Sequence, residues 1–366
     1  MTANPPHEQT IDAVVVGGGQ AALAVGFYLR RSGLSFVILD EQPAPGGTWR
    51  RGWRSLRAFS PAQWSSLPGW QLSKTADAYP SRDAVVAYLA AYETRYQLPV
   101  HRDARVTTVM PDGDRLRVEV KTSPQSTSWL ARAVVSTTGN SPSMPDLSNA
   151  REYTGRRLHS AAYTQPSDFT GRRVVVVGGG NSGAQIVADL TTPGSGVAHV
   201  TWATLAAPTF LPDDVDGRYL FEQATLRYKA EQAGLPAPPM RSLGDIVMVP
   251  PVRAARDRGD LTAHAMFSRF TEHGVFWPDG TESVEDAIIL ATGFKPALGH
   301  LARLGVVSAD GRVEVGGPAG TRAVQQPTLW LVGYGNWTGY ASATLIGVGR
   351  SARATVDDVV TALATA

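Results

Sequence analysis

Two glycine-rich loops, each placed between an apolar strand and a helix, constrain this chain more than any other feature. Residues 17–19 are three glycines that follow the β-branched run 13–16 and precede a helical apolar pattern over 21–29. An apolar run of this kind is typical of a buried parallel strand. The same order recurs around the three glycines at 178–180. The chain is therefore expected to contain two units built on parallel α/β sheets.

The first loop has the spacing of a dinucleotide fingerprint, with Gly17, Gly19 and Ala22 at its fixed positions. Gly17 permits the tight turn, Gly19 lets the backbone approach a pyrophosphate, and Ala22 is small enough for close packing of helix on strand. The N-terminus of the helix offers free N–H groups to the phosphates. Asp40 ends the next strand, about 20 residues beyond Gly19, where a carboxylate can bind a ribose hydroxyl.

The second loop repeats this arrangement. Gly178, Gly180 and Gly183 carry the spacing, and Asn181 and Ser182 are residue types that favour the start of a helix. A second strand is expected at 199–202. Two dinucleotides bound by one chain suggest that a nicotinamide coenzyme delivers hydride to a flavin. The fold expected is α/β, with two Rossmann-like dinucleotide-binding domains, the second inserted into the first.

The residues after the second strand bear on the choice of coenzyme. The segment 203–208 contains no carboxylate for a ribose 2′-hydroxyl and no Arg or Lys for a 2′-phosphate. The nearest basic residue downstream is Arg218. We therefore expect NADH to be accepted, with NADPH as a further coenzyme.

Composition excludes several classes of function. The chain has no cysteine, which removes disulfides, thiolate metal sites, iron–sulfur clusters and dithiol redox chemistry. The net charge of +2 is too balanced for a protein whose main partner is nucleic acid or an anionic membrane. The apolar stretch 11–29 is interrupted by the glycine loop and is a poor membrane span. The N-terminus lacks the features of a secretory signal, so a cytoplasmic location is expected. No metal site is expected.

The order of motifs predicts that one domain interrupts another. We expect the FAD-binding domain to take residues 1–154 and 286–366, and the NAD(P)H-binding domain to take 155–285. Helical spacing predicts helices over 81–98 and 341–363. The segment 213–251 is either a mobile lid or a solvated loop with one helix.

Several short strings then point to a family. They are GGGQAA at 17–22, GGTW at 46–49, YTGRRLHSAAY at 153–163, GGGNSG at 178–183 and ATGF at 291–294. With these strings the chain resembles the class B flavoprotein monooxygenases. Its length and the stretch SLRAFSPAQWSSLPGW are most similar to short bacterial flavin-containing monooxygenases, some of which are encoded in arsenic or metal resistance operons.

The resemblance implies FAD at the first loop, NADPH or NADH at the second, and a reaction with O2 through a C4a-(hydro)peroxyflavin. The substrates implied are small organic molecules: sulfides and amines, or ketones in a Baeyer–Villiger oxidation. A homodimer is common in such a family. The alternative is a flavin oxidoreductase that passes electrons to a protein or to O2 and inserts no oxygen. A third possibility is a redox or ligand sensor.

The fingerprints and the resemblance together predict the residues that contact the cofactors. Those expected at the flavin are Gly17, Gly19, Gln20, Ala22, Asp40, Glu41, Gly47, Thr48, Trp49, Ser60, Gln63, Val106, Thr138, Gly139 and Asn336. Those expected at the nicotinamide coenzyme are Gly178, Gly180, Asn181, Ser182, Gly183, Thr204, Thr292 and Gly293.

Two residues are candidates for a catalytic role. His159 lies in the diagnostic string at 153–163, in the link between the domains, where a hinge histidine that fixes the linker is favoured over a proton-transferring one. Phe59 stands where larger family members place an Asn that steadies the flavin peroxide. Tryptophans interleaved with arginines over 49–70 are expected to pack around the flavin or within the core.

Overall fold

The computed structural model describes residues 8–73, 79–122, 126–236 and 245–365. The chain forms two compact units. The first unit comprises residues 1–50, 62–141 and 295–366, and the second comprises 51–61 and 142–294. The second unit is thus inserted into the first, and the expected α/β class with two dinucleotide-binding units is confirmed.

The first unit is built on a nine-stranded sheet in the order β17-β18-β19-β6-β1-β2-β3, to which β5 and β4 add a hairpin beside β6. The central strands are parallel: β1 pairs with both β2 and β6, and β6 pairs with β19. The strands are β1 (Glu8–Val16), β2 (Phe36–Leu39), β3 (Val100–His101), β4 (Arg105–Asp112), β5 (Arg115–Lys121), β6 (Thr127–Ser136), β17 (Val315–Gly316), β18 (Arg322–Ala323) and β19 (Leu329–Leu331).

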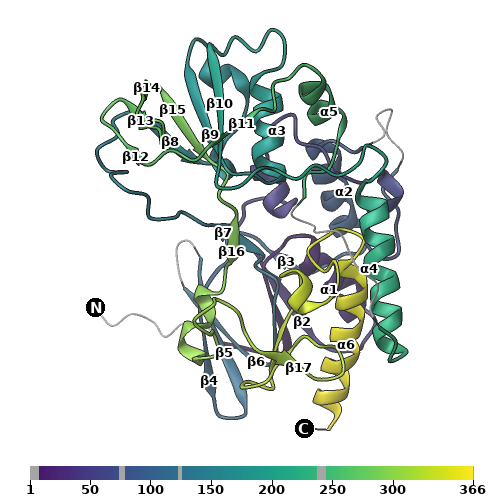
Figure 1. Ribbon diagram of the computed structural model, residues 1–366. Helices are drawn as coiled ribbons and strands as arrows, with labels where there is room; N and C mark the ends of the chain where they lie inside the picture. The colour runs from purple at the N-terminus through teal and green to yellow at the C-terminus, as the bar shows by residue number, and fades with distance from the viewer. Residues whose placement is uncertain (1–7, 74–78, 123–125, 237–244, 366) are drawn as a thin grey trace, which may run out of the picture. The chain divides into compact units, whose positions relative to one another are not determined.

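Helices cover one face of this sheet. They are α1 (Gln20–Leu29), α2 (Arg82–Arg95) and α6 (Val348–Ala364), and Figure 1 shows α1 and α6 side by side. Their buried side chains form one apolar cluster with alternate residues of β1 and β6, such as Val15 and Ala133. Residues of opposite parity, such as Val14 and Val134, pack on the other face beneath the β4–β5 hairpin.

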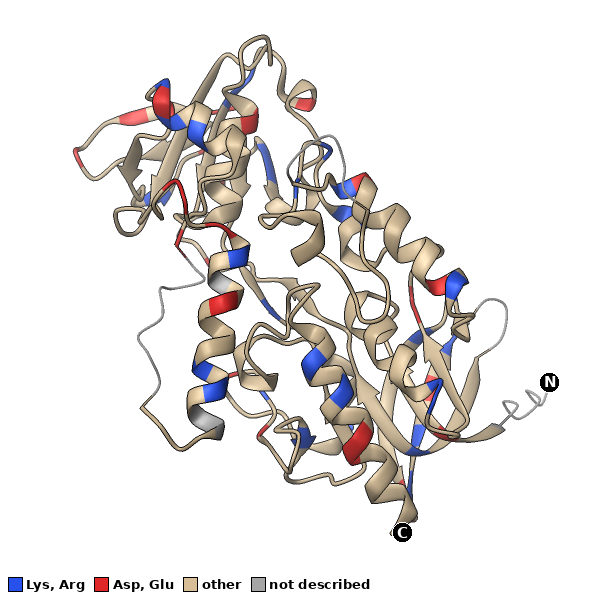
Figure 2. Ribbon diagram, turned by 90° about the vertical axis from the view of Figure 1, so that its right-hand side faces the viewer, with Lys and Arg blue, Asp and Glu red and all other residues tan. Residues whose placement is uncertain are grey.

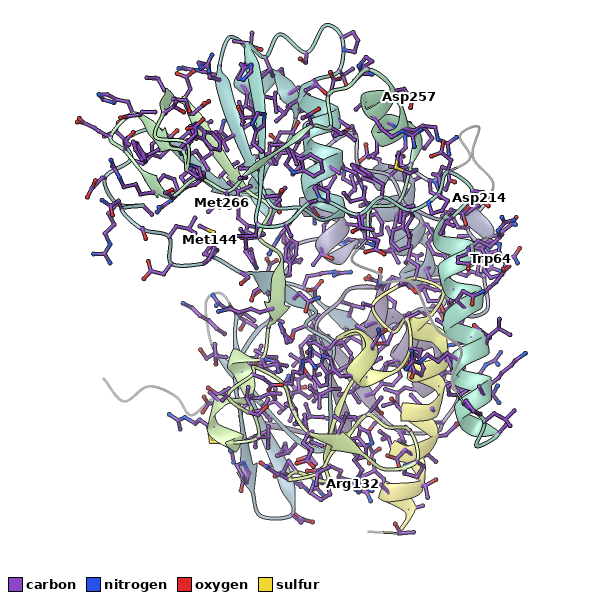
Figure 3. All side chains as sticks on the ribbon, in the orientation of Figure 1. Trp64, Arg132, Met144, Asp214, Asp257 and Met266 are labelled. Carbon is purple, nitrogen blue, oxygen red and sulfur yellow. The ribbon has the colours of Figure 1, made fainter. Side chains whose placement is uncertain are left out.

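Arg132 joins the sheet of this unit to its last helix (Figure 3). Its Nη2 donates to the carbonyl oxygen of Leu363 near the end of α6, and its Nη1 lies 3.2 Å from Oδ1 of Asp12. A cation at the C-terminus of a helix complements the helix dipole. Arg132 thereby fixes α6 against β1, the strand that leads into the first glycine loop.

The second unit has a parallel sheet in the order β11-β10-β9-β15-β8 and a separate antiparallel sheet β12-β13-β14. The helices α3 and α5 pack on one face of the parallel sheet, and the antiparallel sheet contributes to the core of the other (Figure 1). The elements are β8 (Arg156–His159), β9 (Arg173–Val177), β10 (His199–Thr204), β11 (Ala263–Ala265), β12 (Arg269–Phe270), β13 (Gly274–Phe276), β14 (Glu282–Val284), β15 (Ala287–Leu290), α3 (Asn181–Leu190), α4 (Gly217–Gln232) and α5 (Pro250–Asp257).

Two of the passages between the units lie in β7 (Asn140–Pro142) and β16 (Phe294–Pro296), which pair as a two-stranded sheet. The expected boundaries at 154/155 and 285/286 are therefore misplaced. The strand 287–290, expected in the FAD-binding domain, is β15, and it pairs with β9 and β8 at the centre of the second sheet. The apolar sequence of this strand predicts a buried strand but does not indicate which of the two sheets it joins.

Two expected helices have other ends in the structure, and the linker between the domains contains a further strand. The helix expected at 341–363 begins only at Val348, because Ala341 adopts a positive φ of 58° and a Cβ on Gly347 would overlap the Ala341 carbonyl. The helix expected at 81–98 runs from Arg82 to Arg95 and is capped by the Ser81 hydroxyl, which accepts from the N–H of Ala84. The linker around His159 contains the strand β8.

The segment 213–251 contains one long helix, α4, whose first N–H groups are capped by Oδ1 of Asp216. Residues 237–244 of this expected lid lie outside the described residues. Figure 2 shows acidic and basic residues interspersed on α4 rather than separated by sign. No helix among the described residues is long and apolar enough to cross a bilayer.

Glu285, just before β15, is a buried carboxylate with few interactions that would stabilise its charge. Its side chain is 1% exposed, and neither carboxylate oxygen makes a hydrogen bond to a described residue. The nearest cation is Nη2 of Arg173, 3.8 Å from Oε1. Burial raises the pKa of Glu285 above its usual value, so the fold favours the protonated carboxyl.

Glu285→Gln is therefore expected to stabilise the protein at high pH. A carboxyl with a raised pKa in the folded state costs stability as pH rises through that pKa, because it must ionise while buried. The gain should be about 1 kcal/mol at pH 8 and vanish at pH 4. Urea denaturation at both pH values measures it. Glu282→Gln, at an exposed position of β14, is the control, and an equal effect of the two substitutions would contradict this account.

Candidate dinucleotide sites

The first glycine loop is shaped by a close approach to the end of β6. Gly17 has φ of 104°, and a Cβ there would lie 2.8 Å from the carbonyl oxygen of Thr137. Gly19 is the N-cap of α1 and has no side chain to occupy the first N–H groups of the helix. These groups remain available to an anion at the carboxyl edge of the sheet. Ala22 is fully buried beneath them, as the fingerprint predicts.

Asp40 is buried beneath the loop and is paired. A Cβ on Gly18 would overlap its carboxylate, so the middle glycine of the loop makes room for Asp40. Its Oδ2 accepts from Nη1 of Arg102, and its Oδ1 accepts from the N–H of Gln42. Arg102 also binds Glu93 on α2. Burial raises the pKa of Asp40, and the Gln42 N–H and the Arg102 guanidinium oppose this shift.

Arg102 is a residue that sequence analysis missed, because it stands 62 residues from Asp40 and 9 from Glu93 with no motif around it. Its two carboxylate bonds anchor the end of β2 to α2. The predicted contact of Asp40 with a ribose would have to use the remaining lone pairs of a carboxylate that already accepts two hydrogen bonds.

Gln20 ties three segments of the first unit together. Its Oε1 accepts from Nε1 of Trp49 at 3.0 Å, and its Nε2 donates to the carbonyl oxygen of Ala343 at 2.7 Å. The backbone of Gly47, with φ of 53°, passes against Gly19, where a Cβ on Gly47 would lie 2.7 Å from the Gly19 Cα. The GGTW string thus closes over the glycine loop, and the side-chain amide of Gln20 acts as a brace.

A buried hydrogen-bond network lies beyond the loop and holds Thr138. Its hydroxyl donates to the carbonyl oxygen of Ala297 and contacts the hydroxyl of Tyr334, both at 2.7 Å. That Tyr334 hydroxyl lies 2.5 Å from Ser136 Oγ, which in turn contacts Nε2 of His300 at 3.0 Å. Burial lowers the pKa of His300 to about 4. Thr138 is thus tied into the protein, and its contact with a cofactor stays a prediction.

The other residues expected at the flavin come from several segments of the first unit and from Ser60 of the second. Asn336 accepts a long bond of 3.4 Å from the N–H of Ala341, and Gly139 accepts from the N–H of Ala297 at 2.9 Å. Val106, on β4, lies beside a register shift and packs against the core. Among the residues expected at the flavin, Glu41, Thr48 and Gln63 have exposed side chains.

The tryptophans expected around the flavin divide between the cores. Trp53 is buried in the core of the second unit beside Tyr163. Trp49 and Trp70 pack against the core of the first unit, and Trp70 carries the guanidinium of Arg95 over its ring. Trp64, labelled in Figure 3, is half-buried at the end of a short 3-10 helix. Packing within a protein core therefore explains the position of Trp53, and it contributes to the positions of Trp49 and Trp70.

The second loop reproduces the geometry of the first. Gly178 has φ of 129°, and a Cβ there would overlap the carbonyl oxygen of Ala291 at the end of β15. A Cβ on Gly183 would overlap the carbonyl of Gly178, which explains the third glycine of the fingerprint. Trp202, fully buried on β10, donates from Nε1 to the carbonyl of Gly178 at 2.8 Å. Gly180 caps α3 without a side-chain bond.

Asn181 holds the loop to a distant segment. Its Nδ2 donates to the carbonyl oxygen of Asp245, and its Oδ1 accepts from the N–H of Val247. The hydroxyl of Thr292 donates to the carbonyl of Ser143, and Thr204 is buried near Gly179. Asn181 and Thr292 thus support the segments beside the second loop, and their contact with a coenzyme stays a prediction. Ser182 is half-buried on the first turn of α3.

A cavity of about 690 Å³ opens at the carboxyl edge of the second sheet. It is bounded by the glycine loop, the segment after β10, the segment after β11, and the ends of β15 and β7. Met266 lines it, as do Ser143 and Pro145 on either side of Met144 (Figure 3). A crevice outside the carboxyl ends of parallel strands is where open α/β sheets bind nucleotides.

His159 ends β8 and is held by two hydrogen bonds whose directions are fixed. Its Nδ1 accepts from the N–H of Ala161 at 3.1 Å, and its Nε2 lies 3.0 Å from the carbonyl oxygen of Gly293. The first bond requires a bare Nδ1 and the second a proton on Nε2, so the ring is neutral. Its pKa is lowered, chiefly by burial. The ring also packs edge-on against Phe294 in β16.

Phe59 and Ser60 lie beside the start of α4. The carbonyl oxygen of Phe59 accepts from the N–H of Gly217 at 2.8 Å, and a Cβ on Gly217 would lie 2.6 Å from the Phe59 ring and 2.8 Å from the Ser60 Cβ. Phe59 is 37% exposed, whereas Ser60 is buried. The structure thus couples the segment 51–61 to the segment 213–251.

Comparisons with known proteins agree with this geometry. Residues 14–209 match the family described as pyridine nucleotide-disulphide oxidoreductase. A flavin-containing monooxygenase from Stenotrophomonas maltophilia is 48% identical, with a TM-score of 0.86 over 97% of this chain and 99% of that one. The chain belongs to the flavin-containing monooxygenases. An uncharacterized oxidoreductase, CzcO, from Bacillus velezensis is 28% identical over 93% of this chain and 96% of its own.

The monooxygenase shares its fold, but not disulfide chemistry, with more distant structures. A bacillithiol disulfide reductase from Bacillus cereus is 18% identical with a TM-score of 0.73, over 97% of this chain and all of that one. Because this monooxygenase has no cysteine, it cannot use a dithiol of its own. The glycine loops and the N-termini of α1 and α3, which have no side-chain cap, fit two dinucleotides.

The Arg102 pair offers a test of how the flavin unit is anchored. Arg102→Ala leaves the buried Asp40 and the half-buried Glu93 without their cation, and a loss of about 2–4 kcal/mol in stability is expected. The loss should be larger at pH 8 than at pH 5, because burial raises the pKa of both carboxyls and the fraction of each that is ionised grows with pH. Denaturant titration measures both.

Arg105→Ala is the matched control, because Arg105 is 72% exposed and lies 3.8 Å from Glu41. It should change stability by no more than about 0.5 kcal/mol. A comparable loss in the two variants would show that Arg102 acts as an ordinary surface charge.

His159→Ala is expected to destabilise the protein by about 1–2 kcal/mol at pH 8, since two buried backbone groups lose their partner. An imidazole with a lowered pKa keeps its bonds above its unfolded pKa and loses them as pH falls. The difference from the unsubstituted protein should therefore narrow below about pH 6. Flavin should stay bound, and its visible absorbance checks this. A folded, colourless variant would contradict a hinge role.

Proposed function

We propose that this monooxygenase uses NADH or NADPH and O2 to place one oxygen atom on small organic sulfides, amines or ketones. The observation that carries the proposal is the repeated cradle. In each unit a positive-φ glycine meets the carbonyl at the end of the neighbouring strand and leaves a helix N-terminus without a cap. A chain with two such sites and no cysteine fits hydride transfer from a nicotinamide to a flavin.

When bound, the flavin supplies the oxygen-activating chemistry at its C4a atom, and the protein supplies binding, orientation and exclusion of water. The residues of this chain are suited to these tasks. The Gln20 brace closes the GGTW string over the first loop, and Asn181 fastens the segment 245–247 to the second. His159 has both ring nitrogens occupied, which supports the hinge interpretation over proton transfer.

The proposed substrate classes are those that the family resemblance implies. Structures of cyclohexanone monooxygenase, 18% identical with a TM-score of 0.68, share the fold alone. Indole-3-pyruvate monooxygenases of rice are 27% identical over 77% of this chain. The alternative function, electron transfer to O2 without insertion, is favoured by Phe59, which stands where an Asn is expected to steady the oxygenating species. The homodimer and the cytoplasmic location stay predictions.

Product stoichiometry distinguishes the two functions. The protein is supplied with NADPH or NADH, isotopically labelled O2, and either an aryl methyl sulfide or a cyclic ketone. Each turnover should oxidise one coenzyme, place one labelled oxygen atom in the sulfoxide or lactone, and release the other as water. If all electrons appear as hydrogen peroxide and the substrates are unchanged, the alternative is correct.

Gly178→Ala is the control for the coenzyme path. A Cβ there would overlap the carbonyl of Ala291, so the second site should fail while the first keeps its flavin. Reduction by NADPH or NADH should be lost, and reduction by dithionite should persist. A variant reduced by NADPH at the original rate would show that the second loop is not the coenzyme site.

A further inference from the structure

The cavity of the second unit has two distinct ends. In a dinucleotide-binding unit the adenosine ribose lies at the carboxyl end of the second strand, which here is β10. The order β11-β10-β9-β15-β8 places β11 on the side of β10 away from β15. The cavity walls after β10 and after β11, residues 205–209 and 266–269, therefore flank the ribose.

In the segment after β10, the first polar side chain is that of Thr209, so residues 205–208 offer the ribose no hydrogen-bonding side chain. Leu205 is 92% exposed, and Ala206, Ala207 and Pro208 follow it into the cavity wall. None of residues 205–209 is a Lys or Arg, so a cationic partner for a phosphate on the ribose has to come from the other wall.

Arg269 supplies that other wall with a charge. It is the first residue of β12 and lines the cavity, and its side chain is exposed. Its antiparallel partner in the sheet is Phe276, and its guanidinium carbon lies 4.7 Å from the centre of that ring. The stack holds the guanidinium in place without using its five N–H donors.

Arg269 shares the cavity with two carboxylates, Asp146 and Asp245, but is paired with neither. Among the described residues that line the cavity, it is the only Lys or Arg. The structure gives it no ion pair with a described carboxylate, whereas Arg253, Arg256 and Arg258 of the same unit all have one. A guanidinium with free donors is the side chain best suited to a phosphate.

We infer that Arg269 binds the 2′-phosphate of NADPH and sets the coenzyme preference of this enzyme. This inference rests on the proposed use of the second loop as the coenzyme site. The sequence showed only that segment 203–208 has no Arg or Lys for a 2′-phosphate, and Arg269 would supply one from elsewhere in the chain. Arg269 reaches the site from β12, far from the loop after the second strand where such a residue is normally sought.

Binding to the oxidised, FAD-loaded protein tests the inference without turnover. Calorimetric titration with NADP⁺ and with NAD⁺ is carried out on the protein and on Arg269→Ala. The substitution should weaken NADP⁺ about tenfold or more, by loss of a charge-assisted contact, and change NAD⁺ less than about twofold. The fragments 2′,5′-ADP and 5′-AMP should show the same contrast, and added salt should reduce the advantage of NADP⁺.

Two variants sharpen the result. Arg353→Ala removes an arginine of α6 that is 72% exposed, and should leave both affinities unchanged. Phe276→Leu removes the ring beneath Arg269 and should weaken NADP⁺ by less than Arg269→Ala does. Steady-state kinetics should show the same selective rise in KM for NADPH with kcat unchanged.

Two outcomes would overturn the inference. Equal weakening of NADP⁺ and NAD⁺ would place Arg269 at the bridging phosphates, and unchanged affinities would place it outside the site. If the unsubstituted protein bound neither nucleotide, the coenzyme site itself would fail, which separates failure of the proposed function from failure of Arg269.

Discussion

Both units depend on one contact, in which a glycine of positive φ lies against the carbonyl group at the end of a neighbouring parallel strand. Gly17 meets Thr137 in this way, and Gly178 meets Ala291. Any side chain would push the loop off the strand. The contact turns the chain sharply enough for the next residues to begin a helix whose first N–H groups face the crevice. The binding of two dinucleotides follows from this steric constraint before any polar side chain is considered.

Around this contact the polar side chains act mainly as structural supports. Asp40 is held by Arg102, Gln20 spans Trp49 and Ala343, and Asn181 fastens a remote segment. Thr138 is used in the same way. Supports of this kind keep the rims of a site rigid, so that little order must be created when a cofactor binds. This explains why residues that sequence motifs assign to a cofactor are found bonded to the protein itself.

The glycine loops, the strands that lead into them and the insertion of one unit into the other follow from the sequence, because each signal is local. Arg102 and Arg269 do not, because their roles arise from contacts between segments far apart in the chain. The strand β8 could not be predicted from the sequence for a related reason. Its residues include Arg156 and Arg157, and only pairing with β15 identifies it as an edge strand. The late start of α6 depends on the backbone of Ala341, which its residue type does not reveal.

The tautomer of His159 gives this enzyme a natural spectroscopic marker. A buried imidazole N–H that donates to a carbonyl exchanges slowly with water, and its proton resonance moves far from the amide region. The acceptor, the carbonyl of Gly293, precedes the strand β16 by which the chain returns to the first unit. Changes in that single resonance would follow rearrangement of the return strand during turnover, with no label introduced into the protein.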